Sequence, residues 1–408
     1  MTGPPRLGWL DALRGMAALV VVFDHSSYTF MPDFRQDLMP HFNTSRYGIL
    51  VFFLVSGYIV PHSLERRGCV RSFWVGRIFR VYPLWAAVVS ALLALHVLGI
   101  AELRDLGSHS TATVVIAHLT MLQELLGTPG VLLVLWTLSY EMSFYLLVVG
   151  LFTVRLQRRS AAFAVLLAVL AAGSVTAGVT LRPSALSADF GTGPVIAFAA
   201  IAMGTALSCA GAENAVLRVS GGVLGGVLAL VLVACNGTVP LWEGLVILAV
   251  MFLGTTVHRT EAGQCSRVFA VGTAVVVSVC AVGSAYWWDD GDHFTRGGWI
   301  TAFMLALITF GAGMAVRNRC LPRVLTGLGT ISYSIYLVHP VLLTVIDSTV
   351  GRRGHDTPVL EVAFFVVLLP VCLLTHRWIE APNQEWGRGL ARRLTRRTQV
   401  TEDDVRTP

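Results

Sequence analysis

Repeated apolar runs of about twenty residues dominate this sequence, and that is the length at which a helix crosses the hydrocarbon core of a bilayer. Of the 408 residues, 55% are hydrophobic and only 13% are charged, whereas soluble domains carry roughly a quarter charged residues. We therefore predict an all-α, polytopic transmembrane helix bundle. The candidate spans lie near residues 8–28, 47–64, 78–99, 131–154, 161–181, 193–210, 219–235, 239–257, 268–286, 299–316, 326–348 and 359–378.

The number of spans is expected to be ten to twelve. The runs 219–235 and 239–257 are joined by a very short connection. If two segments re-enter the membrane or lie on its surface, the count falls to ten. The run 111–126 is apolar but short, and it fits a helix that lies at the interface.

Arginine sets the expected orientation, because cytoplasmic loops of membrane proteins carry an excess of positive charge. All 30 basic residues are Arg. Both termini are placed in the cytoplasm, so that most Arg fall inside, including those at 66–71, 155–159, 317–323 and 392–397. The net charge of +6 is then explained by anchoring and gives no reason to expect nucleic acid as a partner. Acidic residues at 289–292 fall in an outer loop.

Two regions of unequal size follow from this distribution. Residues 1–384 are expected to form the transmembrane domain, and residues 385–408 a cytoplasmic, Arg-rich tail that is partly disordered. The seven Cys form no CxxC pair and no cluster with His, so the sequence predicts neither a disulfide framework nor a metal site.

Ionisable residues inside the first span are candidate functional residues, because placing each one at mid-bilayer costs at least a few kcal/mol of free energy. Arg14 and His25 are eleven residues apart, almost three helical turns, so both face one side of a helix and lie about 16 Å apart along its axis. Asp11 precedes Arg14 by three residues and is placed to pair with it. The alternative is that Arg14 snorkels to the interface and His25 is a hydrogen-bonded packing residue.

Further polar positions occur at the third and fourth spans. Arg77 and Arg80 lie one turn apart and close in sequence to 66–71, which is more positive charge than anchoring needs and suits a phosphorylated anion. Glu141 lies inside the fourth span, where a lone carboxylate is costly unless it is paired. We expect Glu141 to orient His25, as a carboxylate does for a histidine base.

Aromatic and histidine positions complete the candidate set. Trp136 and Tyr145 flank Glu141 in sequence, and Tyr336 and His339 recur at helical spacing in a polar stripe near the C-terminus. We treat these four as candidate substrate-binding residues. An interface anchor for Trp136 and hydrogen bonding between helices for the stripe are the alternatives.

Taken in order, several short motifs of the chain resemble the acyltransferase 3 family of membrane proteins. They are Leu-Asp-x-Leu-Arg-Gly with Arg14-x10-His25, Phe-Phe-x-x-Ser-Gly at 52–57, Arg-x-x-Arg-x-Tyr-Pro at 77–83, Trp-x-Leu-Ser-x-Glu at 136–141, Ile-Ser-Tyr-Ser-x-Tyr-Leu-x-His at 331–339 and Glu-x-Pro at 380–382. Each motif is weak alone, but together they span residues 10–382 in the family's order.

The resemblance implies transfer of an acyl group, usually acetyl, from coenzyme A thioesters to hydroxyls of sugars, glycans or glycosylated small molecules such as macrolides. It also implies functional roles for Arg14, His25 and the acid Glu141. We expect the acyl-CoA phosphates at Arg14, Arg77 and Arg80, and His25 as the base or as a transient acyl carrier. No metal is expected. The predicted location is the plasma membrane, in contact with lipid, of a GC-rich bacterium.

A secondary transporter or flippase for a lipid-linked sugar is the alternative from another class, because intramembrane charge also fits transport. Transporters tend to contain two related halves with paired broken helices. No second copy of the 14–25 or 136–141 pattern occurs in this sequence. The acyltransferase is therefore the favoured prediction.

Overall fold

A computed structural model describes residues 8–104, 109–179, 181–288 and 295–406, with side chains up to residue 395. Within these residues every regular element is a helix and no strand occurs, which confirms the predicted all-α bundle. The chain divides into two units. The first comprises Met1–Val55, Leu84–Arg104 and Val282–Glu380, and the second comprises Ser56–Pro83, Asp105–Ala281 and Ala381–Pro408.

Six α-helices lie wholly within the first unit. They are α1 (Gly8–Phe30), α2 (Pro32–Leu38), α13 (Arg296–Ala315), α14 (Arg323–Thr330), α15 (Ser332–Thr349) and α16 (Pro358–Thr375), and a π-helical turn (His376–Glu380) follows. Three more helices are shared with the second unit, namely α3 (Thr44–Arg67), α4 (Val70–Val97) and α12 (Arg267–Trp287).

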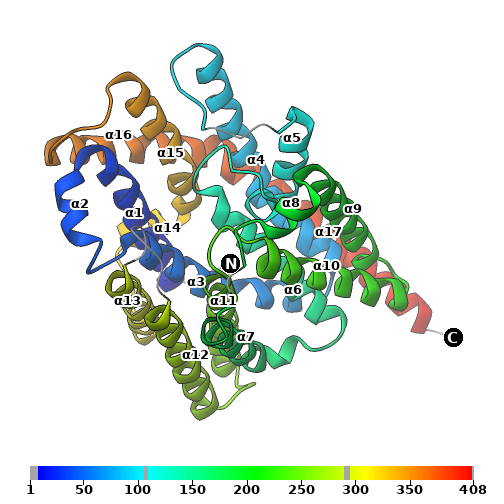
Figure 1. Ribbon diagram of the computed structural model, residues 1–408. Helices are drawn as coiled ribbons and strands as arrows, with labels where there is room; N and C mark the ends of the chain where they lie inside the picture. Colours follow the sequence, from blue (N-terminus) through cyan, green and yellow to red (C-terminus); the bar gives the residue numbers. More distant parts are fainter. Residues whose placement is uncertain (1–7, 105–108, 180, 289–294, 407–408) are drawn as a thin grey trace. The chain divides into compact units, whose positions relative to one another are not determined.

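Helix α1 is the centre of the first unit and packs against α13, α14, α15 and α16 (Figure 1). Its crossing with α14 is very close. A Cβ on Gly329 would lie 1.9 Å from the Asp11 carbonyl oxygen, and one on Gly15 would lie 2.7 Å from the Gly329 nitrogen. Only glycine fits at such a contact between backbones, as in other helix pairs of membranes.

Among the described residues, the second unit contains eight α-helices of its own and two short 3₁₀ turns. They are α5 (Thr111–Thr120), α6 (Leu135–Thr153), α7 (Ser160–Thr176), α8 (Ala185–Phe190), α9 (Thr192–Ala210), α10 (Ala215–Asn236), α11 (Leu241–Glu261) and, at the C-terminal end, α17 (Ala381–Arg406), with 3₁₀ turns at Gln123–Leu126 and Gln157–Arg159. Eight helices are thus named, of which α8 is a single short segment of six residues.

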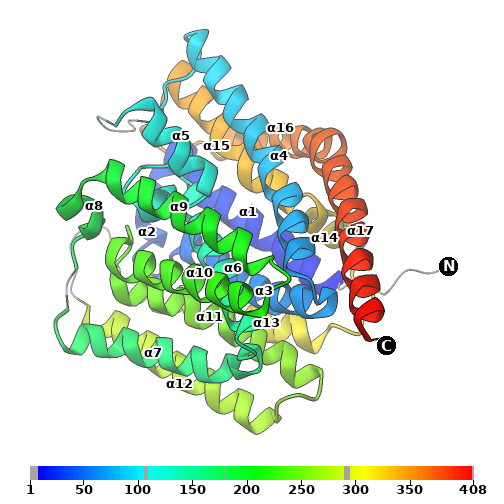
Figure 2. The same ribbon diagram turned by 90° about the vertical axis from the view of Figure 1, so that its right-hand side faces the viewer.

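Helix α10 lies between α6 and α9, and α7 lies along α11 (Figure 2). Small residues again allow the closest contacts, because a Cβ on Gly57 of α3 would lie 1.8 Å from the Met251 carbonyl oxygen of α11. Gly57, the last residue of the motif at 52–57, thus lies where another helix approaches closely. The predicted boundary at residue 384 falls inside α17.

Ten helices among the described residues are long and apolar enough to cross a membrane, or eleven if the bent pair α14 and α15 forms one span. These helices match eleven of the twelve predicted runs. Helix α1 forms over 23 residues as expected, but it is not among the ten because Asp11, Arg14, Asp24 and His25 make it more polar. The apolar run at 111–126 is a short helix followed by a 3₁₀ turn, as its length predicted.

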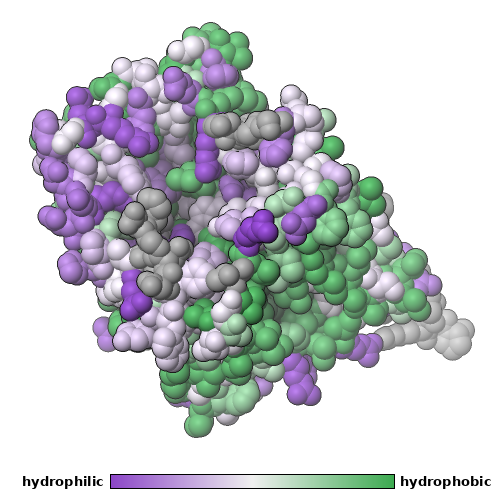
Figure 3. Space-filling model, viewed as in Figure 1, coloured by the Kyte–Doolittle hydropathy of each residue, from purple (hydrophilic) through white to green (hydrophobic). Residues whose placement is uncertain are grey.

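Exposed apolar side chains cover the outer helices of the second unit. Phe198 and Ile201 of α9 and Val216 of α10 are 70% or more exposed. Figure 3 shows hydrophobic surface over the region where α9 and α10 lie in Figure 1. A contiguous apolar surface of this kind marks contact with lipid.

Candidate functional site

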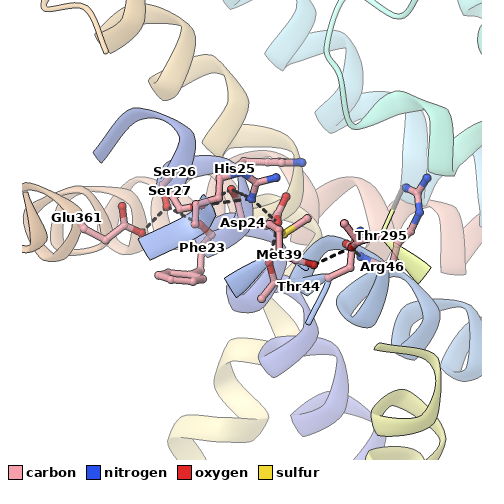
Figure 4. A network of polar contacts seen from close by, with 12 residues as sticks. Phe23, Asp24, His25, Ser26, Ser27, Met39, Thr44, Arg46, Thr295 and Glu361 are labelled. Carbon is pink, nitrogen blue, oxygen red and sulfur yellow. Dashed lines mark hydrogen bonds and ion pairs between the residues drawn. The ribbon is translucent and has the colours of Figure 1, made fainter. Parts of the chain in front are cut away.

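A buried carboxylate organises the C-terminal end of α1. Asp24 is 2% exposed, and its Oδ1 accepts hydrogen bonds from the Arg35 guanidinium at 2.8 Å and from the Thr44 hydroxyl at 2.6 Å (Figure 4). The Arg35 guanidinium also lies 3.5 Å from the centre of the Tyr28 ring. A buried carboxylate needs such partners because its desolvation is costly. This network fixes the backbone on which the next residue, His25, is presented.

His25 pairs with a second histidine from α15. Its Nδ1 lies 2.9 Å from Nε2 of His339, and the two rings are stacked with centres 5.2 Å apart. His339 is completely buried, whereas His25 is partly exposed. The two residues are 314 positions apart in sequence.

The hydrogen bonds determine which nitrogen of each neutral ring carries the proton. Nδ1 of His339 lies 2.8 Å from the Ile335 carbonyl oxygen, which only accepts, so this nitrogen donates. Nε2 of His339 is then an acceptor, and Nδ1 of His25 must donate to it. In the neutral pair, the remaining lone pair therefore resides on Nε2 of His25. That is the protonation state a general base requires.

Three further contacts hold the surroundings of this histidine pair. Tyr336 packs edge-on against His339, with ring centres 6.1 Å apart, and against Phe52 at 5.7 Å. Ser26, next to His25, donates a hydrogen bond to Glu361 of α16 at 2.5 Å (Figure 4). Helices α1, α15 and α16 thus all contribute to the position of the His25 ring.

A separate apolar pocket of about 490 Å³ opens on another face of α1. It is lined by Met16, Leu19, Val20, Phe23, Phe34, Leu38, Phe42, Thr44, Leu325, Leu328 and Phe365. Phe23 and His25 are two residues apart, about 200° around a helix, so this pocket and the imidazole lie on opposite sides of α1. The pocket therefore has no direct part in chemistry at His25.

Glu141 lies in a cluster of its own within the second unit. Its Oε1 accepts a hydrogen bond from the Ser56 hydroxyl at 3.2 Å and a short one from the Tyr145 hydroxyl one turn further along α6. The Arg77 guanidinium lies 5.1 Å from the centre of the Tyr145 ring and 5.4 Å from that of Phe73. The cluster joins α3, α4 and α6 through one carboxylate and one buried guanidinium.

Arg80 and Trp136 lie in the same unit as this cluster. The charges of Arg77 and Arg80 both act on the Tyr145 hydroxyl, so the two Arg that the sequence singled out lie near one group. Trp136 packs edge-on against Tyr140, with ring centres 5.8 Å apart. The second unit thus brings together Arg77, Arg80, Tyr145 and Glu141.

The predicted site residues fall into two sets, one in each unit. Arg14, His25, Tyr336 and His339 belong to the first unit, and the remaining five belong to the second. The structure confirms that one uninterrupted helix carries Arg14 and His25. The predicted support of His25 by Glu141 stays a prediction, because the two residues belong to different units. Within the first unit, the partner of His25 is His339.

Sequence reasoning missed three side chains around His25. Arg35 and Thr44 hold Asp24, and Glu361 accepts from Ser26. Asp24 itself indicated that such a partner exists, because an acid inside an apolar run needs a polar group nearby. Glu361 is one of several acids at helix ends, and nothing in its sequence neighbourhood singles it out.

A chain of membrane-length helices that holds buried polar clusters among apolar side chains, one cluster in each unit, defines a multi-pass membrane protein. A family model described as an acyltransferase domain matches residues 7–377. The chain therefore belongs to the acyltransferase 3 family, as its motifs indicated, and is a membrane acyltransferase. Searches of curated proteins and of solved structures give no match.

Proposed function

We propose that this membrane acyltransferase moves a short acyl group, in the first instance acetyl, from a coenzyme A thioester to a hydroxyl of a sugar, glycan or glycosylated small molecule. The observation that carries this proposal is the hydrogen-bonded histidine pair. It leaves Nε2 of His25 as the acceptor of a proton, and a hydroxyl needs a base when it attacks a thioester.

The reaction balances with one proton. The acceptor oxygen attacks the thioester carbonyl carbon while Nε2 of His25 takes the hydroxyl proton. The carbon–sulfur bond then breaks, and the proton passes from the imidazolium to the thiolate. The products are an O-acyl ester and free coenzyme A, and the enzyme returns to its starting state.

The other residues have supporting roles in this proposal. Arg14, Arg77 and Arg80 bind the phosphates of the donor, because guanidinium groups match phosphate oxygens well. Glu141 supports the charge that develops on the imidazole. Trp136, Tyr145, Tyr336 and His339 were predicted to bind substrate. For His339 the hydrogen bond to His25 favours a positioning role instead.

Release of free thiol from acetyl-CoA by the purified protein, measured with and without candidate glycosides, tests the proposal, and mass spectrometry of the acceptor detects the added acetyl group. We expect His25→Ala to lose about 10²–10⁴-fold in rate, the usual contribution of a general base. His41→Ala is the matched control, because His41 is exposed. Equal activity of both variants would remove His25 from the reaction.

A further inference from the structure

A second polar pocket, of about 370 Å³, lies in the second unit. Four of its seven lining residues are arginines, Arg66, Arg67, Arg388 and Arg392, and the others are Ser72, Ala391 and Thr395. The volume lies at the lower end of the range for small-molecule sites, about 300–1,000 Å³. Four guanidinium groups around one small space make a strongly positive pocket.

Two segments far apart in sequence build this pocket. Arg66 and Arg67 end α3, whereas Arg388 and Arg392 lie one turn apart on α17. Gly387 allows α17 to lie directly on α4, because a Cβ there would be 2.4 Å from the Cβ of Phe79. This close contact places the next residue, Arg388, at the pocket.

Arg67 is held in place by backbone. Its Nη1 donates to the Ser72 carbonyl oxygen at 2.7 Å. The guanidinium also rests on Gly76, where a Cβ would lie 2.4 Å from the same nitrogen. The charges of Arg66 and Arg77 both act on Arg67, so like charges are gathered here rather than dispersed.

Acidic side chains do little to neutralise the pocket. Glu65, the neighbour of Arg66, already pairs with Arg259 of α11. Glu385 lies 3.8 Å from Arg388, and its side chain is 72% exposed, so this pair is weak. Among the side chains that the structure describes, Arg66, Arg67 and Arg392 have no carboxylate partner. Gathering positive charge without partners costs free energy, which an anionic ligand would offset.

We propose that Arg66, Arg67, Arg388 and Arg392 form a phosphate-binding site and that α17 supplies half of its charge. The ligand chemistry is a group with one or more phosphates. Guanidinium groups bind phosphate oxygens through paired, charge-assisted hydrogen bonds. Helix α17 begins at residue 381, after the residues 7–377 that the family model matches, so the half of the site that α17 supplies lies outside the matched region, whereas Arg66 and Arg67 lie inside it.

Two carriers present such phosphates, the nucleotide of coenzyme A and the headgroup of an anionic phospholipid. The nucleotide carrier rests on the proposed function, whereas the lipid carrier does not. Both carriers require the same Arg side chains. Binding of pyrophosphate therefore tests the site itself, and coenzyme A and phosphatidylglycerol identify the carrier.

Binding of pyrophosphate to the purified full-length protein is measured by isothermal titration calorimetry for wild type, Arg392→Gln and Arg393→Gln. Arg393 is the matched control, since it is the adjacent residue on the same exposed helix and does not line the pocket. We expect Arg392→Gln to weaken binding about tenfold or more and Arg393→Gln to change it less than twofold. Added salt should weaken binding to wild type.

The same three proteins are then titrated with coenzyme A and reconstituted in nanodiscs of phosphatidylcholine with or without phosphatidylglycerol. A tenfold loss of coenzyme A affinity in Arg392→Gln identifies the nucleotide as the carrier. If Arg392→Gln retains less phosphatidylglycerol than wild type, as measured by native mass spectrometry, the lipid is the carrier. The proposal is overturned if Arg392→Gln and Arg393→Gln behave alike with all three probes.

Thiol release measured in parallel separates this site from the acyl-transfer reaction. If wild type binds pyrophosphate through Arg392 but releases no thiol from acetyl-CoA, the phosphate site stands and the proposed function fails. If thiol is released while binding of no probe depends on Arg392, the proposed function stands and the phosphate site fails. Size-exclusion profiles of each variant show that folding is retained, and Arg392→Lys should keep part of the affinity.

Discussion

Replacement of His339 offers the sharpest test of the histidine pair. Nε2 of His339 accepts the Nδ1 proton of His25 at 2.9 Å, and the His339 side chain is completely buried. Replacing His339 with Leu leaves that donor without its acceptor, at a cost of about 1–3 kcal/mol. His25 then avoids the cost by moving its proton to Nε2, which removes the base. At about 1.4 kcal/mol per tenfold, the rate falls about 5- to 150-fold.

A matched pair of variants makes this test specific. In His339→Gln, the side-chain carbonyl oxygen reaches about as far as Nε2 and is able to accept from His25, so we expect most of the rate to be retained. In His339→Asn, the shorter amide mimics only Nδ1, so the rate should resemble that of His339→Leu. The assay is thiol release from acetyl-CoA at saturating donor across a pH series. Equal kcat and equal pH profiles for the Gln and Leu variants would refute the reasoning.

Three further predictions concern stability. Asp24→Asn removes one partner of the buried pair with Arg35 and should cost about 3–5 kcal/mol, seen as a lower thermal midpoint in detergent; an unchanged midpoint contradicts the pairing. Burial lowers the pKa of His118 below its usual value of 6.5, although a hydrogen bond to the backbone of Val114 acts in the opposite direction. The neutral imidazole therefore stabilises α5 fully above pH 6.5, and this contribution is lost as the pH falls below 6.5. Hydrogen exchange of the α5 amides should accelerate below pH 6.5 in wild type but not in His118→Gln. Gly57→Ala forces a Cβ to within 1.8 Å of the Met251 carbonyl oxygen, so the folded yield should drop, whereas Gly173→Ala, with open space around it, should not.

The sequence predicted the helices well because the apolar runs are long and the membrane dictates their length. It also placed Arg14 and His25 on one helix, since helical geometry relates residues only eleven positions apart. The sequence could not predict which helices pack against each other. His25 and His339 are separated by 314 positions, and a periodic pattern shows which residues share a face but not which face meets which.

The C-terminal region illustrates the same limit. The cluster of Arg at 392–397 was predicted to belong to a cytoplasmic, partly disordered tail. In the structure, residues 381–406 form α17, and Arg388 and Arg392 line one pocket with Arg66 and Arg67. Composition indicated the positive charge correctly. It could not indicate that a glycine, Gly387, lets this helix lie against Phe79.

The contact between Gly387 and Phe79 has a consequence for how such an enzyme could diversify. The histidine pair and the arginines of α17 lie in separate parts of the chain, and α17 follows the segment that the family model matches. Substitutions in this last helix would therefore change the affinity for a phosphorylated compound while leaving the proton-accepting imidazole intact. Affinity and reactivity would then be adjustable by independent genetic changes, one at a time.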